Sequence, residues 1–194
     1  MKVKICGVAT LDDAVFLSQI GIDMIGIVNE PSSPRFAKRE FNRIVKSKVD
    51  KPVVGVTVRG SLSLQAEDML QVHRVLSLEE ISSLTTLNIS NFIFYVPASE
   101  EGKEYLKDLA SAGVKNILVD SPRKGEKTSF KVAKEILDVF PEAGVAGGIT
   151  PLNVMDFVRL NPGWIDVSSG VESYPGKKDH DKVMKIKEAV RNGV

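Results

Sequence analysis

The sequence has few of the features that mark secreted or membrane-bound proteins. Its 194 residues include one cysteine, Cys6, and one tryptophan, and no apolar run is long enough to cross a bilayer. A single cysteine cannot form an internal disulfide, so we expect the protein to work in a reducing compartment, the cytoplasm. No signal-like apolar stretch follows Met1, and we therefore expect no membrane association.

Neither sign of charge is in excess. The 26 Lys and Arg side chains are balanced by 25 Asp and Glu side chains, which gives a formal net charge of +1. Proteins that bind nucleic acid or anionic membranes usually carry a clear basic excess, so we expect neither kind of partner. The expected partner is a small molecule, and the sequence leaves the oligomeric state open.

The chain is expected to form one domain over residues 1–194. Its hydrophobic content of 43% is enough for a sizeable core, and no linker or low-complexity tract interrupts it. Short β-branched runs alternate with longer amphipathic segments, which is typical of an α/β fold with a parallel sheet. Eight strands are predicted, at Val3–Cys6, Met24–Val28, Val53–Val58, Asp68–Val72, Phe92–Val96, Ile117–Asp120, Gly144–Gly147 and Trp164–Val167. Seven helices are predicted, at Leu11–Gln19, Lys38–Lys46, Leu78–Leu84, Glu100–Ala112, Ser129–Phe140, Asn153–Leu160 and Asp179–Arg191.

This order of elements predicts a (β/α)8 barrel, although such barrels typically have about 250 residues. The shortening is found after the third strand, where RGSLSLQAE leaves too little chain for a full crossover helix. We therefore expect the helix between strands three and four to be shortened or absent. The main alternative is an open doubly wound sheet, but its first turn is commonly glycine-rich, and CGVATLDD has one glycine.

In a barrel of this kind, the chemistry gathers at the carboxyl ends of the strands. Cys6 lies at the first such end, on the same strand face as Lys4, because side chains alternate along a strand. A lysine ammonium beside the thiol would favour the thiolate, and so a base near neutral pH, from a group whose free pKa is about 8.5. A lone cysteine is nevertheless more often a small buried hydrophobic residue, and the pattern alone leaves both interpretations open.

Two aspartates lie at other strand ends. Asp120 ends the run NILVD, where partial burial would raise its pKa toward the range of a general acid. The alternative is that Asp120 caps the following loop. Asp166, in WIDVSSG, precedes the end of the last strand, and we expect it to orient other groups or to contact substrate.

The last two strands end in small residues. Gly147 and Gly148 follow the seventh strand, and Ser169 and Gly170 follow the eighth. Barrels frequently bind phosphate at this pair of loops, where backbone N–H groups and a short extra helix face the anion. We therefore predict a phosphate site there.

Two further residues are candidates for binding. Arg35, in EPSSPRF, follows two prolines that stiffen its loop, and its fork of donors suits a planar carboxylate. It could equally be a surface arginine. His73 ends the fourth strand and is a weaker candidate, because the sequence shows no partner for it.

A series of motifs along the chain resembles the phosphoribosylanthranilate isomerases of tryptophan biosynthesis. In order between residues 2 and 181, these motifs are KICGVAT, SSPRF, LQVH, ILVDS, VAGGITPLNV, IDVSSGVE and PGKKD. The combination of KICG with DVSSGVE and PGKKD is specific, whereas GG or SPR alone would carry little weight. The resemblance implies an Amadori rearrangement of N-(5'-phosphoribosyl)anthranilate on a (β/α)8 barrel, without metal or cofactor.

The resemblance also implies roles for the candidate residues. Cys6 falls on the general base of the family and Asp120 on its general acid. Arg35 matches the position that holds the anthranilate carboxylate. The phosphate loops of the family are matched by Gly147, Gly148, Ser169 and Gly170.

The sequence departs from the family pattern at two places. Arg74 follows His73 where the family usually has glycine, and the loop after Asp120 keeps only Gly125, Thr128 and Phe130 of a glycine-rich threonine loop.

Three alternative functions remain open. They are an isomerase of a histidine-pathway aminoaldose, which would use aspartate in place of Cys6, a lyase for an indole-containing phosphate, and a phosphate-binding barrel without catalysis.

Overall fold

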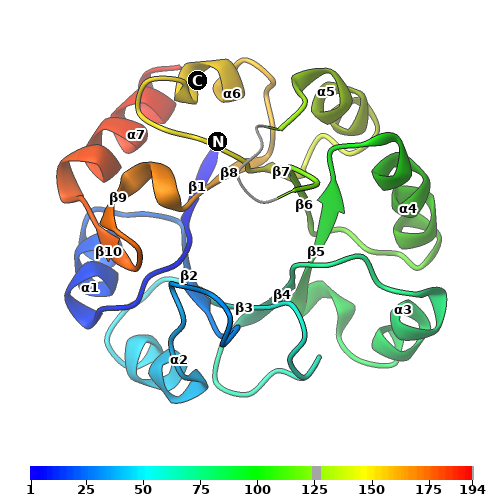
Figure 1. Ribbon diagram of the computed structural model, residues 1–194, viewed down its shortest axis with the longest axis horizontal. Helices are drawn as coiled ribbons and strands as arrows, with labels where there is room; N and C mark the ends of the chain where they lie inside the picture. Colours follow the sequence, from blue (N-terminus) through cyan, green and yellow to red (C-terminus); the bar gives the residue numbers. More distant parts are fainter. Residues whose placement is uncertain (124–127, 194) are drawn as a thin grey trace.

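A computed structural model describes residues 1–123 and 128–193, and its eight parallel strands close into a barrel (Figure 1). The strands are β1 (Lys2–Ile5), β2 (Met24–Val28), β3 (Val53–Thr57), β4 (Met69–Val72), β5 (Phe92–Pro97), β6 (Ile117–Asp120), β7 (Gly144–Val145) and β8 (Trp164–Val167). Each strand pairs with the next along the chain, and β8 pairs with β1 to close the sheet. The predicted (β/α)8 barrel is therefore confirmed.

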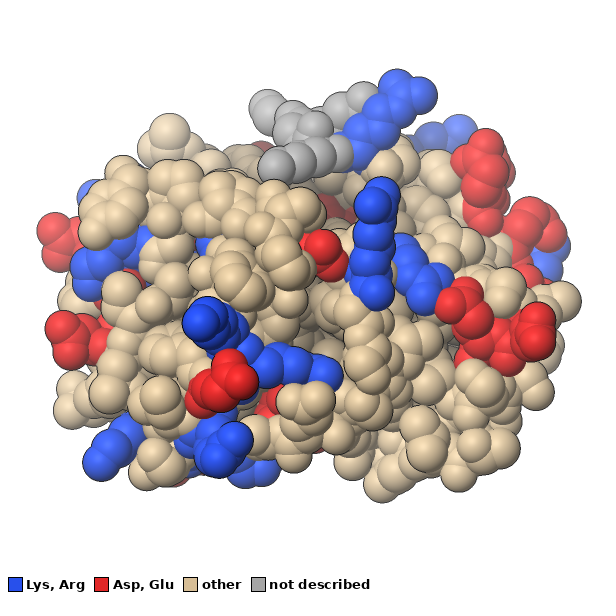
Figure 2. Space-filling view, turned by 60° about the horizontal axis from the view of Figure 1, so that its bottom comes forward, with Lys and Arg blue, Asp and Glu red and all other residues tan. Residues whose placement is uncertain are grey.

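Helices form a ring outside the strands (Figure 1). They are α1 (Leu11–Gln19), α2 (Arg39–Lys46), α3 (Leu78–Thr85), α4 (Glu100–Ser111), α5 (Phe130–Val139), α6 (Val154–Val158) and α7 (His180–Asn192), with a short 3-10 helix, η1 (Ile89–Asn91), before β5. Among the described residues, no helix is both long and apolar enough to cross a membrane. On the face seen in Figure 2, acidic and basic side chains are interspersed.

Four predicted carboxyl ends of strands are wrong by one or two residues. Cys6 and Val58 each lie just beyond their strands, β5 continues to Pro97, and β7 stops at Val145. The early end of β7 has a backbone cause, because Gly147 and Gly148 have φ values of +98° and +77°, which a strand cannot accommodate.

No helix lies between β3 and β4, as the length of this crossover predicts. A buried polar cluster covers the barrel at this point. The carboxylate of Glu67 accepts hydrogen bonds from Arg39 (2.6 Å) and from Asn42 (3.1 Å), and Asn42 also bonds Asn29. Hydrogen-bonded side chains thus replace the apolar face that a helix would supply.

The interior of the barrel changes from apolar to polar along its axis. Val54, Ile93, Leu118 and Trp164 form an apolar cluster inside the strands, with Met24 packed against it. The residue two positions further along each of the four strands lines a pocket: these residues are Val56, Tyr95, Asp120 and Asp166. Because strand side chains repeat every two residues, the apolar cluster forms the floor of that pocket.

The chain after β8 forms structure that the sequence analysis predicts only in part. A 3-10 turn, η2 (Ser169–Val171), follows β8, as expected for a phosphate loop. A small antiparallel hairpin, β9 (Glu172–Tyr174) and β10 (Lys177–Lys178), then leads into α7. This hairpin contains the end of the IDVSSGVE motif and most of PGKKD, and it lies beside β1 and α1 (Figure 1).

Candidate active site

A cavity of about 770 Å³ lies at the carboxyl ends of the strands, within the range of small-molecule sites. Eight of the nine candidate residues line it: Cys6, Arg35, His73, Asp120, Gly147, Gly148, Asp166 and Ser169. The ninth, Gly170, is not among the lining residues. A smaller hollow of about 290 Å³ at the start of β1 contains none of these residues.

Cys6 follows β1 directly and is buried, with 7% of its surface exposed. Its backbone N–H donates to the carbonyl of Val167 (2.9 Å), so the position of Cys6 is set by the junction of β1 with β8. Gly26 of β2 leaves room for the thiol. A Cβ at Gly26 would lie 3.0 Å from both the Sγ of Cys6 and the Nζ of Lys4.

The expected ammonium is present beside the thiol, but the pKa of Cys6 is not lowered. Burial raises the pKa of the Cys6 thiol above its ordinary value, and Lys4 and Lys178 only partly oppose this shift. A thiolate near neutral pH was expected because of the neighbouring cation. The free-energy cost of charging a thiol in an apolar environment is larger, and it outweighs the effect of that cation. The thiol is therefore mostly protonated at neutral pH.

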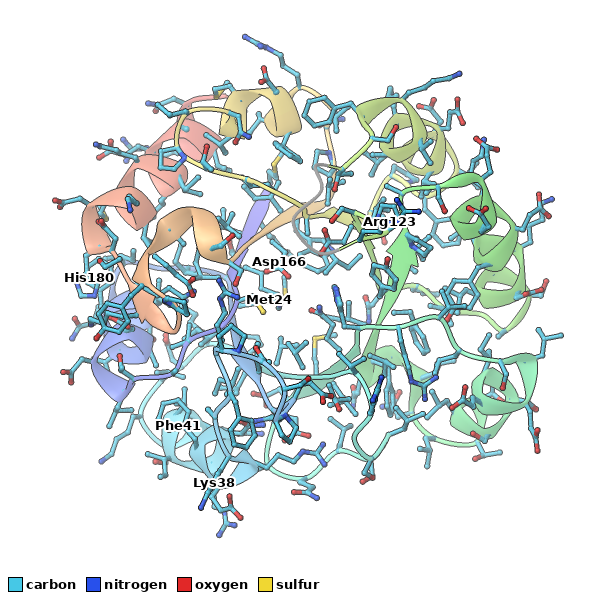
Figure 3. All side chains as sticks on the ribbon, viewed as in Figure 1. Met24, Lys38, Phe41, Arg123, Asp166 and His180 are labelled. Atoms are coloured by element: carbon cyan, nitrogen blue, oxygen red, sulfur yellow. The ribbon has the colours of Figure 1, made fainter. Side chains whose placement is uncertain are left out.

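Lys4 and Asp166 form a buried ion pair inside the barrel. The Nζ of Lys4 donates to Oδ2 of Asp166 at 2.8 Å, across the paired strands β1 and β8. The other oxygen of Asp166, Oδ1, is buried and has no hydrogen-bond partner among the described residues. Figure 3 shows Asp166 pointing into the barrel. A substrate hydroxyl group could satisfy this oxygen.

Asp120 is suited to hold a proton near neutral pH. Burial raises its pKa to about 6, although the N–H and hydroxyl of Ser121 donate to Oδ1 and oppose the shift. Asp166 adds to the rise, because a second carboxylate nearby disfavours a second negative charge. Oδ2 is the oxygen that faces His73, at 3.7 Å from Nε2.

His73 has partners that the sequence did not reveal. Its Nδ1 lies 3.2 Å from Nε2 of Gln71, and its ring packs against Tyr95 with centroids 4.6 Å apart. Burial lowers the pKa of His73 to about 4, so the imidazole is neutral at physiological pH. A neutral ring can donate one hydrogen bond and accept one.

The loops after β7 and β8 are packed closely together. A Cβ at Gly147 would lie 2.0 Å from the Oγ1 of Thr128, and a Cβ at Gly170 would lie 1.9 Å from the carbonyl oxygen of Ile149. Only glycine fits at either place. Thr128 donates to the carbonyl of Ala146 at 2.6 Å, which fixes Thr128 against the chain that follows β7. Gly125 of that loop lies outside the described residues.

Arg35 reaches the cavity and forms a two-pronged ion pair with Glu172. Its Nε and Nη2 donate to the two carboxylate oxygens at 2.8 and 2.7 Å. The two residues are 137 positions apart, and the sequence analysis assigned Glu172 no role. Hydrogen bonds from Arg35 and Lys178 lower the pKa of Glu172 despite the opposing effect of burial, which keeps the carboxylate charged.

The sequence analysis also missed the role of the PGKKD segment. Lys178 is fully buried, and its ammonium donates to the Glu172 carboxylate (2.9 Å) and to the carbonyl of Cys6 (2.6 Å). Its neighbour Lys177 bonds Asp13 of α1. The PGKKD motif marks Lys178 as a residue of interest, but its hydrogen-bond acceptors can be identified only in the folded chain. Within the described residues, no group of three or more His, Cys, Asp or Glu side chains is arranged to hold a metal ion.

Comparisons with known proteins agree with this geometry. The family model for "N-(5'phosphoribosyl)anthranilate (PRA) isomerase" matches residues 3–189. The N-(5'-phosphoribosyl)anthranilate isomerase of Sulfolobus acidocaldarius is 43% identical over 195 residues, which cover 98% of this chain and 96% of the relative. That of Saccharolobus solfataricus is 42% identical over 199 residues, which cover 100% and 97%.

Solved structures show the same similarity. The phosphoribosyl anthranilate isomerase of Thermotoga maritima superimposes with a TM-score of 0.85 at 27% identity, over 99% of both chains. A phosphoribosyl anthranilate isomerase in complex with reduced 1-(o-carboxyphenylamino)-1-deoxyribulose 5-phosphate gives a TM-score of 0.82 at 28% identity, again over 99% of both chains. The chain belongs to the N-(5'-phosphoribosyl)anthranilate isomerase family.

Proposed function

We propose that this protein isomerises N-(5'-phosphoribosyl)anthranilate to 1-(2-carboxyphenylamino)-1-deoxyribulose 5-phosphate in tryptophan biosynthesis, with Cys6 as general base and Asp120 as general acid. The family assignment supports the reaction. The observation that carries the assignment of roles is that one cavity contains both the thiol and a carboxyl group whose pKa is about 6.

The first step opens the sugar ring. Asp120 delivers its proton to the ring oxygen of the furanose while the nitrogen lone pair forms a C=N bond and the C1'–O bond breaks. The product is an open-chain iminium with a free C4' hydroxyl. A pKa of about 6 suits this role, because the best general acids have pKa values near the working pH.

The second step moves a proton from carbon. The iminium makes the C2' hydrogen acidic, the Cys6 thiolate removes it, and the electron pair forms a C1'=C2' bond that neutralises the nitrogen. The enol then becomes a ketone as C1' gains a proton from Cys6 and the C2' hydroxyl loses one to Asp120, which returns both groups to their starting states. No atom is lost or added overall, as an isomerisation requires.

The anthranilate ring carries a carboxylate, and Arg35 is suited to bind it. Glu172 occupies the edge of the guanidinium formed by Nε and Nη2. A guanidinium has a second edge, formed by Nη1 and Nη2, with two further parallel N–H donors. We assign the substrate carboxylate to that edge, while Glu172 holds the arginine in place.

The loops after β7 and β8 are assigned to the phosphate. Gly147 and Gly170 have no side chain that would keep an anion from the backbone, and the η2 turn begins at Ser169. At the other end of the sugar, Asp166 and His73 are assigned to the ribose hydroxyls. The buried Oδ1 of Asp166 supports this, since it has no hydrogen-bond partner among the described residues.

The alternative functions gain no support from the comparisons. A histidine-pathway aminoaldose isomerase would have an aspartate at the position of Cys6, and an indole-phosphate lyase would not need the KICG motif. A barrel without catalysis would not need to keep both Cys6 and Asp120. The cytoplasmic location indicated by the single cysteine stays a prediction.

A turnover assay tests the proposal. Purified protein is mixed with freshly generated phosphoribosylanthranilate, and the fall in substrate fluorescence is followed against a reaction without protein. We expect protein-dependent loss of fluorescence and formation of the ketose phosphate. Turnover of the histidine-pathway aminoaldose alone would instead support the alternative isomerase, and phosphate binding without any turnover would indicate a barrel that has lost catalysis.

A further inference from the structure

A lysine is buried where the first and last barrel strands meet. The Nζ of Lys178 has no exposed surface and faces three acceptors: the Cys6 carbonyl at 2.6 Å, the Glu172 carboxylate at 2.9 Å and the Ser168 carbonyl at 3.4 Å. An ammonium has three N–H donors, so its capacity is fully used. Burying a lysine is unfavourable unless such partners are present, which indicates a role beyond filling space.

One of these acceptors belongs to the backbone of the proposed base. The Cys6 carbonyl is part of the peptide that joins it to Gly7, where the chain turns through a φ of +73°. The Cys6 N–H is already held by Val167 of β8. With its carbonyl held by Lys178, both polar backbone groups of Cys6 are fixed, and so is the direction of the Cα–Cβ bond that carries the thiol.

Glu172 connects this lysine to Arg35. Its carboxylate accepts from the Arg35 guanidinium, from Lys178 and from the N–H of Gly176 in the hairpin turn. These contacts link Arg35, which is assigned to the anthranilate carboxylate, with Cys6, which is assigned to proton abstraction. The link passes through the buried carboxylate of Glu172. The separation of Arg35 and Cys6 is therefore set inside the protein.

We propose that Lys178 is a positioning residue for the reaction: together with Glu172, it fixes the Cys6 peptide and the Arg35 guanidinium, so that the thiol is aimed at the substrate carbon. This inference rests on the proposed function. A misplacement of about 1 Å can reduce turnover about a hundredfold, so such a device has a measurable effect.

The network also acts on the charge of the thiol. The charged groups that face Cys6 are Lys4 of β1, Asp166 of β8, Lys178 of β10 and Arg35 of the loop after β2. Lys178→Met removes a cation, so the pKa of the thiol should rise. Glu172→Gln removes the anion between two cations, so the pKa of the thiol should fall.

These opposite shifts separate the proposal from a merely structural role. A loosened site would admit water in both variants and move the thiol pKa downward in both. Because Cys6 is the only cysteine, the rate of alkylation by iodoacetamide as a function of pH reports its pKa directly. Lys177→Met is the matched control, because Lys177 is in the same strand and bonds Asp13 away from the thiol.

The experiment measures this thiol pKa together with kcat and KM for the wild type and the three variants. For Lys178→Met we expect a raised thiol pKa and a loss of about tenfold to a hundredfold in kcat, with a smaller change in KM. Glu172→Gln should lower the thiol pKa and raise KM, because it releases Arg35. Lys177→Met should match the wild type in both thiol pKa and kcat.

A wild-type kcat and thiol pKa in Lys178→Met would overturn the proposal, and so would shifts of the same sign in both variants. If Lys178→Met does not fold, as judged by circular dichroism, Lys178→Gln replaces it, because the amide can still donate hydrogen bonds but carries no charge. A raised thiol pKa in Lys178→Gln supports the proposal, and an unchanged or lowered one rejects it. If the wild type turns over no phosphoribosylanthranilate, the proposed function fails, while the thiol titrations still test the network.

Discussion

Nε2 of His73 lies 3.7 Å from Oδ2 of Asp120, and burial shifts the pKa values of the two groups in the directions that disfavour an ion pair between them. Burial raises the pKa of Asp120 to about 6 and lowers the pKa of His73 to about 4. By the time the imidazole gains a proton on acidification, the carboxyl group has gained one too. The deliverable proton of the site therefore belongs to Asp120.

The pH dependence of kcat/KM follows from the two assigned groups. The active form needs a thiolate at Cys6 and a protonated Asp120, although the pKa of the acid lies below the raised pKa of the thiol. We expect kcat/KM to increase up to about pH 6, to stay level, and to fall above the pKa of the thiol. A profile measured in mixed buffers at constant ionic strength checks this. A kcat/KM that is constant from pH 5 to pH 7 would show that the protonation state of Asp120 in the free enzyme does not control the rate.

Asp120→Asn should remove turnover and stabilise the fold at neutral pH. The amide cannot deliver a proton, so we expect a loss in kcat of about a hundredfold or more, with inorganic phosphate still bound. Because the carboxyl group has a higher pKa in the folded chain than in the unfolded chain, wild-type stability falls as pH rises from about 4 to 6.

Unfolding by denaturant at pH 4 and pH 7 measures this difference. From pH 4 to pH 7, the free energy of unfolding of Asp120→Asn should rise by on the order of 2 kcal/mol relative to that of the wild type. If the difference in the free energy of unfolding between variant and wild type is the same at both pH values, folding does not raise the pKa of Asp120. Lost phosphate binding would make Asp120 a structural residue of the phosphate loops.

Arg35→Met should weaken substrate binding more than it slows the chemistry. The variant loses the guanidinium edge assigned to the anthranilate carboxylate and leaves Glu172 with Lys178 and the N–H of Gly176. We expect KM to rise by about tenfold or more, because a charge-assisted, two-pronged pair is lost. Arg43→Met, on the outer helix α2, is the matched control and should keep the wild-type KM. An unchanged KM in Arg35→Met would place the carboxylate elsewhere.

The crossover between β3 and β4 should be less protected than its neighbours. Its backbone N–H groups bond side chains instead of a helix: those of Arg59 and Gly60 donate to Glu30 and Thr57. We expect faster hydrogen exchange over residues 59–67 than in the crossovers that contain α1, α2 and α4. Mass spectrometry of exchanged peptides measures it, and equal protection would contradict the expectation.

Much of the fold was predictable because it is encoded locally. Strand and helix periods predict the eight strands in order, and the 11 residues between Thr57 and Met69 are too few for a crossover that contains a full helix. Candidate residues at strand ends lie around one cavity because parallel strands of a barrel place their carboxyl ends on one face. These inferences use sequence spacing and no tertiary contact.

The remaining features depend on contacts between distant segments. Glu172 meets Arg35 137 residues away, and Lys178 meets the Cys6 carbonyl 172 residues away, so no local pattern contains either pair. The pKa of Cys6 was misjudged for the same reason: Lys4 is two positions away in the sequence, whereas the burial that outweighs it comes from the whole barrel.

The turnover number of Cys6→Ser tests the central claim most directly. A serine hydroxyl has almost the shape of the thiol but is a far poorer base near neutral pH. If the thiolate removes the C2' proton, kcat should fall by about a hundredfold or more while KM stays within about threefold of the wild type. A Cys6→Ser enzyme with near-normal kcat on phosphoribosylanthranilate would contradict the account, because the thiol could then have no part in proton transfer.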